Sequence, residues 1–143
     1  MAEISQLTTA SEQALADLNG LVAALRRESE TKGTFLELKK ILDNEQTAVF
    51  VAKDREKIVG AAFLFIAQKI GKCIGYVEDV IVSDKCRGQG LGKGLMSAVI
   101  DEARKRGCTY LHLTSKPDRV AANKLYQKLG FEVVKTNPYK LKL

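Results

Sequence analysis

The spacing of apolar residues separates a helical N-terminal part from a central run of strands. Ile4–Leu7 alternates weakly and predicts a short strand. Apolar side chains then recur every three or four residues in Glu12–Arg27 and again in Phe35–Leu42, which predicts two amphipathic helices. The first third of the chain therefore reads as one strand followed by two helices.

In the central part the apolar period changes to that of strands. Ala48–Asp54 and Ile58–Gln68 flank a tight polar turn and predict a β-hairpin, and Cys73–Val82 predicts a third strand. The last part alternates again: Gly88–Arg106 and Asp118–Leu129 have helical spacing and each ends at a glycine. The remaining predicted strands are Thr109–Ser115 and a pair in Phe131–Leu143 around Asn137-Pro138.

The predicted order, β-α-α-β-β-β-α-β-α-β-β, indicates a mixed α/β fold and not the strict alternation of a doubly wound sheet. The chain has 143 residues, which suits one domain over residues 1–143. The longest apolar run, Ile58–Ala67, is far shorter than the roughly 20 residues that span a bilayer. No leader-like segment opens the chain, so we expect a soluble, cytoplasmic protein without a membrane partner.

The charge balance does not by itself select one class of ligand. With 23 Lys and Arg against 17 Asp and Glu the formal net charge is +6, which suits either an anionic ligand or a solvated basic surface. Tryptophan is absent and no recognition-helix pattern occurs, so a nucleic-acid partner is disfavoured.

The cysteines and the single histidine exclude two further classes. Cys73, Cys86 and Cys108 form no paired spacing, which argues against a disulfide framework. Together with His112 they do not make a zinc-ligand set, so we expect no metal. A nucleophile pair of Cys86 or Cys108 with His112 stays open, although no spacing supports it.

The most informative segment is a strand that runs into a glycine-rich turn and then a helix. After Val77–Val82 the chain reads Arg87-Gly88-Gln89-Gly90-Leu91-Gly92-Lys93. Glycines let a backbone approach a ligand, and the N–H groups at a helix start bind phosphate, here between two basic residues. The spacing matches neither a Walker loop nor GxGxxG, so a turn that needs glycine only for packing is the alternative.

This segment, RGQGLGK, resembles the acyl-CoA-binding signature of the GNAT superfamily of acetyl-CoA-dependent N-acetyltransferases. Ala121–Phe131, a helix with a tyrosine followed by Gly-Phe, resembles the second motif of that family at the expected distance. The resemblance covers nearly the whole chain and is weakest over the first 45 residues. It implies a central splayed mixed sheet of about seven strands flanked by about four helices.

The resemblance also implies where acetyl-CoA binds, in the splay between Cys73–Val82 and Thr109–Ser115. The pantetheine arm would pair with the strand edge at Val80, Ile81 and Val82, as an added strand does. The pyrophosphate would lie on the turn, and Asn123 would hold the pantetheine or the pyrophosphate. The implied pyrophosphate contacts are Arg87, Gly88, Gln89, Gly90, Leu91, Gly92 and Lys93.

Acyl transfer to an amine needs a base, donors for the developing oxyanion and an acid for the thiolate. Glu78 precedes the pantetheine-pairing stretch and is the predicted base, with Asp79 or a water chain as alternatives. Backbone N–H groups near Val80 and Ile81 are the predicted oxyanion donors. The resemblance points to Tyr126 as the acid; a surface role for Glu78 and a core role for Tyr126 are the alternatives.

The acceptor amine is not identified by the sequence. We expect its pocket from the first two helices, a loop near Ser29–Thr34 and the tail around Thr136–Tyr139. The chain has some likeness to glucosamine-6-phosphate N-acetyltransferases, but Ala121–Tyr126 departs from their usual motif, so a primary amine of a small molecule is the prediction. A protein substrate, a non-catalytic acyl-CoA sensor and a homodimer stay open.

Overall fold

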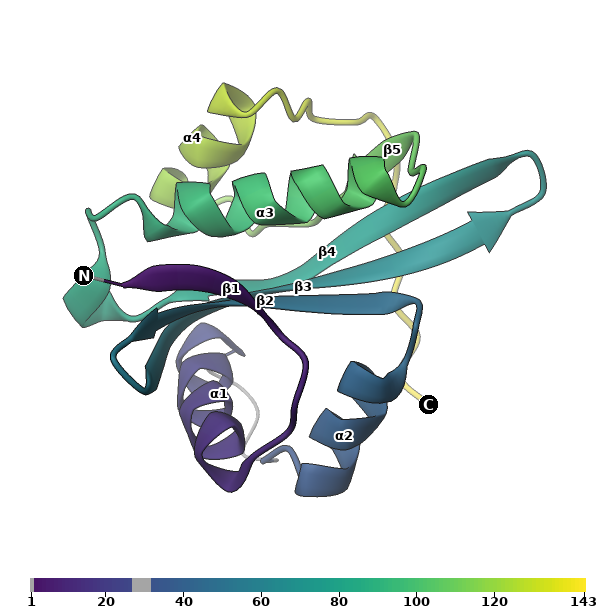
Figure 1. The fold of residues 1–143 in the computed structure, drawn as a ribbon. Coiled ribbons are helices and arrows are strands. Elements are labelled where there is room, and N and C mark those ends of the chain that lie inside the picture. Colours follow the sequence, from purple (N-terminus) through teal and green to yellow (C-terminus); the bar gives the residue numbers. More distant parts are fainter. Residues whose placement is uncertain (1, 27–31) are drawn as a thin grey trace.

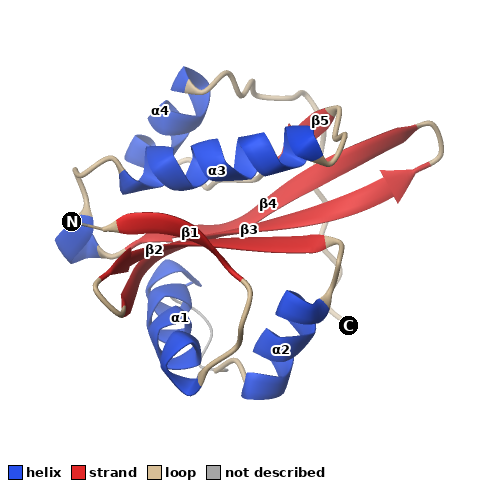
Figure 2. Ribbon diagram, viewed as in Figure 1, coloured by secondary structure: helices blue, strands red, loops and turns tan. Residues whose placement is uncertain are grey.

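The computed structural model describes residues 2–26 and 32–143, in which a sheet lies between two layers of helices (Figures 1 and 2). The strands are β1 (Glu3–Leu7), β2 (Thr47–Asp54), β3 (Lys57–Lys69), β4 (Lys72–Val82) and β5 (Tyr110–His112). The helices are α1 (Glu12–Arg26), α2 (Phe35–Asp43), α3 (Leu91–Lys105) and α4 (Val120–Lys128), with a 3₁₀ turn, η1, at Asp84–Cys86.

The strands follow one another in space as they do in the chain, in the order β1-β2-β3-β4-β5. The first four are antiparallel, and β5 is parallel to β4. Helices α3 and α4 cover one face of the sheet, and α1 and α2 cover the other (Figure 1). The mixed α/β architecture predicted from the order of elements is confirmed.

Strand β2 shows why the sequence needs apolar residues without interruption at the centre of the sheet. Ala48, Phe50 and Ala52 belong to the core under α3, whereas Val49 and Val51 belong to the core under α1 and α2. Successive side chains of a strand point to opposite faces, so a strand covered on both faces must be apolar at every position.

The predicted strand count is wrong: the described residues form five strands, not about seven. The tail, residues 132–143, adds no strand, and its Val133 and Tyr139 side chains are 87% and 91% exposed. In Figure 1 the tail runs from the α4 layer past the edge at β5 towards α2. A segment that crosses the strands cannot continue their ladder, whatever its apolar alternation.

Two predicted boundaries also shift. Strand β5 has three residues in place of the seven of Thr109–Ser115. Helix α3 begins at Leu91 and not at Gly88, because Gly88 and Gly90 adopt φ values of 78° and 76°, outside the helical region. Among the described residues, no helix is both long and apolar enough to cross a membrane.

Candidate active site

A β-bulge in β4 interrupts the regular alternation of side chains. The register pairs Ala61 with Ile81 and Phe63 with Glu78, so β3 offers only one residue opposite Asp79 and Val80. Asp79 has a φ of 49°, in the left-handed region that a non-glycine residue seldom adopts. The bulge turns Val80 back to the α3 face, where Val77 also packs.

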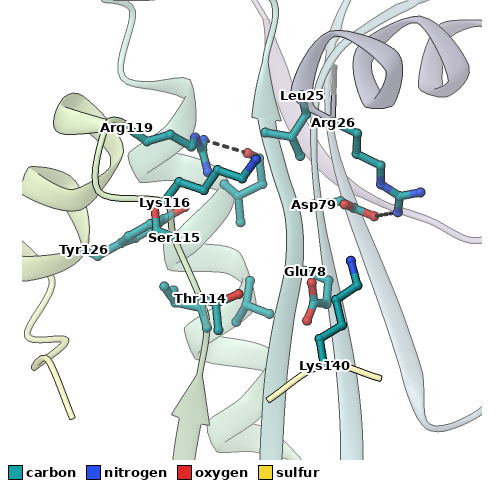
Figure 3. Close-up of a pocket in the computed structure, with 13 residues that line it drawn as sticks. Leu25, Arg26, Glu78, Asp79, Thr114, Ser115, Lys116, Arg119, Tyr126 and Lys140 are labelled. Atoms are coloured by element: carbon teal, nitrogen blue, oxygen red, sulfur yellow. Dashed lines mark hydrogen bonds and ion pairs between the residues drawn. The ribbon is translucent and has the colours of Figure 1, made fainter. Parts of the chain in front are cut away.

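The bulge lies where β4 and β5 separate. Their parallel pairing covers only Ile74–Tyr76 with Tyr110–His112, so the edge of β4 after Tyr76 has no strand beside it. An open pocket of ≈560 Å³ lies at this separation (Figure 3). It is lined by Leu25, Arg26, Val77, Glu78, Asp79, Val80, Leu113, Thr114, Ser115, Lys116, Arg119, Tyr126 and Lys140.

The two carboxylates of β4 share one wall of this pocket but have different partners. Arg26 at the end of α1 donates to Asp79, with an N–O distance of 2.9 Å (Figure 3). Glu78 makes no hydrogen bond or ion pair with a described residue. Burial raises the pKa of Glu78 above its usual value, the Asp79 carboxylate raises it further, and Arg26 opposes both. Of the two, Glu78 is therefore the carboxylate suited to accept a proton.

Tyr126 comes to the pocket from the opposite side, on α4. Its side chain is 5% exposed and stacks edge-to-face on Phe131, with ring centroids 5.9 Å apart. Burial raises the pKa of Tyr126, opposed by the charge and the hydrogen bond of Arg119, so the phenol keeps its proton at neutral pH. Tyr126 is thus both a core residue and a part of the pocket wall.

The glycine-rich turn has the shape of an anion site. Gly90 is the N-cap residue of α3 and provides no side-chain cap, which leaves the first N–H groups of the helix without that partner. A Cβ at Gly88 or Gly90 would meet no atom within 4 Å, so both glycines border open space. Arg87 and Lys93 are exposed on either side, and Arg87 pairs with Asp84 at 2.9 Å.

The turn is joined to the pocket through the packing of α3 on α4. A Cβ at Gly92 would lie 3.4 Å from Leu125, which precedes Tyr126 in the chain. The predicted pyrophosphate site and the predicted acid therefore belong to neighbouring helix ends.

Other predicted site residues lie away from the pocket. Leu91 is a buried core residue under α3, and Ile81 is buried on the α1 face. Gln89 is exposed on the turn, and Val82 is half-buried at the end of β4. Asn123 donates from its amide nitrogen to the carbonyls of Lys116 and Arg119, both at 2.9 Å, which fixes the loop before α4.

The described residues fit acetyl-CoA, the donor that the resemblance implies. The edge of β4 from Val77 onward lacks a neighbouring strand, and the start of α3 presents N–H groups to an anion. In addition, the Ser115 hydroxyl is buried in the pocket wall without a hydrogen-bond partner among the described residues. A buried hydroxyl of this kind can bond to a ligand that enters the pocket.

Sequence reasoning missed the basic side chains of the pocket. Arg119 donates to the Val80 carbonyl across 3.4 Å, and Lys116 lies in the same loop between β5 and α4. Arg26 and Lys140 come from two other segments, α1 and the tail. No local pattern distinguishes these residues from the many other exposed cations of the chain. Of the elements expected around the acceptor, α1 lines the pocket with Leu25 and Arg26, and the tail lines it with Lys140, one residue beyond the expected Thr136–Tyr139. Neither α2 nor Thr136–Tyr139 itself lines the pocket. Within the expected Ser29–Thr34 loop, residues 29–31 lie outside the described part of the chain.

Comparison with known proteins places this geometry in a family. The model of the acetyltransferase (GNAT) family matches residues 15–131, which is most of the chain. The chain belongs to the GNAT family. The family match covers both motifs, the bulged strand β4 and the whole of α3 and α4.

The individual relatives and solved structures similar to this chain are named for different acceptors. Over 88 residues the chain is 38% identical to a glucosamine 6-phosphate N-acetyltransferase of Trypanosoma brucei brucei, an alignment that covers 59% of this chain and 58% of the relative. A solved Trypanosoma brucei acetyltransferase is 28% identical over 100% of both chains, with a TM-score of 0.81. A solved aminoglycoside acetyltransferase from a soil metagenome shares the fold, with a TM-score of 0.83 at 23% identity over 99% of this chain and 97% of that one.

Proposed function

We propose that this GNAT-family protein transfers the acetyl group of acetyl-CoA directly to a primary amine of a small molecule. The observation that carries the proposal is the meeting of Glu78, Tyr126 and the open edge of β4 at Val80 in one pocket. These three come from segments up to 48 positions apart in the chain, Glu78 and Tyr126 being the outermost. Acetyl-CoA supplies a thioester whose carbonyl carbon an amine can attack.

Glu78 removes the proton of the attacking amine. Its carboxylate has no hydrogen bond or ion pair with a described residue. Burial raises its pKa towards neutral pH, which makes it a better proton acceptor. Asp79 beside it is paired with Arg26 and has a different role, because its charge adds to the rise in the pKa of Glu78 that burial causes. A water molecule between Glu78 and the amine would serve the same transfer.

On the other side of the reacting carbonyl, the bulge exposes the backbone at Val80. Its carbonyl accepts from Arg119, and Val80 shares with Asp79 the single β3 residue opposite them. Its N–H therefore does not belong to a regular ladder pair and can donate to the oxygen that gains charge. Tyr126 keeps its phenolic proton and can pass it, or hydrogen-bond, to the departing sulfur. Each residue therefore acts at a different atom of the reaction.

The charge of the pocket favours an acceptor that carries an anionic group. Arg26, Lys116, Arg119 and Lys140 line the pocket against only two carboxylates. An aminoglycoside carries several positive charges and would be repelled, whereas an amino sugar phosphate would be attracted. The relative named for glucosamine 6-phosphate supports the same choice.

The experiment that tests this function measures thiol release with acetyl-CoA and matched acceptors, glucosamine 6-phosphate and glucosamine. We expect turnover with an at least 10-fold higher kcat/KM for the phosphorylated sugar, about the effect of one hydrogen-bonded charge. Equal kcat/KM values would contradict the charge argument. Tight acetyl-CoA binding without turnover of any amine would instead favour a non-catalytic acyl-CoA sensor.

The role of Glu78 is tested by the pH–rate profile of Glu78→Gln. We expect a rate at neutral pH lower by about 10² or more, and partial recovery at high pH, where the free amine needs no base. Parallel profiles for the variant and the wild type would mean that Glu78 only positions the acceptor.

A further inference from the structure

The C-terminal tail brings an amine of the chain itself into the acceptor side of the pocket. Phe131, just before the tail, packs on Tyr126 in the α3 layer. Lys140, near the end of the tail, lines the pocket together with Leu25 and Arg26 of α1. The tail therefore passes from one face of the sheet to the other (Figure 1). It places Lys140 in the same pocket as Glu78, the predicted base (Figure 3).

The Lys140 amine is directed towards the two carboxylates of β4 (Figure 3). No described residue forms an ion pair with it, and Asp79 is already paired with Arg26. The carboxylate of Glu78 is also without such a partner among the described residues. A lysine side chain presents the same group, a primary alkylamine, that the proposed reaction consumes.

The tail also has the freedom to deliver this amine. No hydrogen bond or ion pair links residues 132–143 to the rest of the described chain, and their side chains are exposed. A reactive group on such a tether reaches a nearby site at an effective concentration in the millimolar range. A free amine whose concentration lies below this effective concentration therefore enters the pocket no faster than Lys140 does.

We propose that Lys140 is an acetylation site of the protein's own activity, modified within the same chain when no small-molecule amine is present. The inference rests on the proposed acetyltransferase function. A C–N bond forms between Lys140 Nζ and the acetyl carbon, and the thioester C–S bond breaks. The ammonium group loses two protons: one leaves through Glu78 to solvent, and the other balances the proton that the CoA thiolate gains to become a thiol.

Acetylation of Lys140 changes the pocket as well as the tail. It removes one of the four cations and leaves a neutral amide in their place, so anionic acceptors lose an attraction. An acceptor that occupies the pocket excludes Lys140 in turn. Acceptor turnover and self-acetylation are therefore competing outcomes at one site.

The experiment incubates the full chain with acetyl-CoA alone and maps acetylated lysines by mass spectrometry. Lys142, two positions along the same tail and outside the pocket wall, is the internal control. We expect one acetyl group, at Lys140, added at least 10-fold faster than at Lys142 and at a rate independent of protein concentration. Lys140→Arg should abolish this product, Lys142→Arg should not, and Glu78→Gln should slow it by about 10-fold or more.

Four results would overturn the inference. Equal rates at Lys140 and Lys142 would indicate unassisted chemical acetylation, and a rate that grows with protein concentration would indicate transfer between molecules. Turnover of a small amine without any acetyl-Lys140 would reject the inference while the proposed function stands. If neither thiol release nor acetyl-Lys140 is found, both fail together.

Discussion

Replacing Gly90 with valine tests the glycine-rich turn through its backbone alone. Gly90 has a φ of 76°, and a Cβ added there would meet no atom within 4 Å. The added Cβ therefore meets no clash with the described protein. The effect expected at this position is the strain of an L-residue in the left-handed region, about 1–2 kcal/mol.

The strain must lower either the free energy of unfolding of the free protein or its affinity for acetyl-CoA. If the turn keeps its conformation, the free energy of unfolding of the free protein falls by about 1–2 kcal/mol. If the turn relaxes instead, the N–H groups at the start of α3 no longer face the position predicted for the pyrophosphate. Acetyl-CoA must then restore the strained form, which weakens its binding by about 5- to 30-fold, at 1.4 kcal/mol per factor of ten.

The assay combines denaturant unfolding of the free protein with calorimetric titration of acetyl-CoA. Gly90→Asn is the matched control, because asparagine tolerates positive φ far better than valine and should remain near the wild type. Pantetheine, which lacks the pyrophosphate, should bind the valine variant as it binds the wild type. Wild-type stability together with wild-type acetyl-CoA affinity in Gly90→Val would refute the assignment of this turn.

Further substitutions address the other parts of the site and the fold. Tyr126→Phe should lower kcat by about 10-fold or more without changing acetyl-CoA affinity, because only the hydroxyl is lost. Wild-type turnover in this variant would mean that Tyr126 is a core residue and not the proton donor. Because the pKa of Glu78 is raised in the fold, the contribution of Glu78 to stability should fall as pH rises above about 4.5. Urea unfolding should therefore show Glu78→Gln gaining stability relative to the wild type between pH 4 and pH 7, and a constant difference would contradict this. Burial, together with the Cys73 thiol 3.6 Å away, raises the pKa of Cys108 to about 11. Because the thiolate is the reactive form, Cys73→Ala should speed alkylation of Cys108 at pH 9. An unchanged alkylation rate would leave burial as the only cause of the raised pKa. Thr34→Ala removes the capping box of α2 and should lower the free energy of unfolding by about 1 kcal/mol in urea, whereas no change would mean that the helix start is held by packing alone.

Elements whose apolar spacing repeats locally could be predicted from the chain alone. Helices α1 and α2 were predicted within a residue or two, as was the hairpin of β2 and β3, because each amphipathic or fully apolar period reports which faces are covered. The glycine-rich turn before α3 was also located, since only glycine readily adopts the positive φ found at Gly88 and Gly90. The resemblance to the family rests on this turn and on the Tyr126 helix.

Which side chains share the pocket could be seen only in the packed structure. The bulge at Asp79 exists because β3 offers one residue against two of β4, a mismatch between strands that no single strand reveals. Arg26 of α1 and Lys140 of the tail line the same pocket as Glu78, although they are far apart in the chain. The tail leaves the sheet although its apolar residues alternate as a strand's do. Local patterns encode the period of an element, whereas contacts between distant segments depend on how the packed elements are placed against one another.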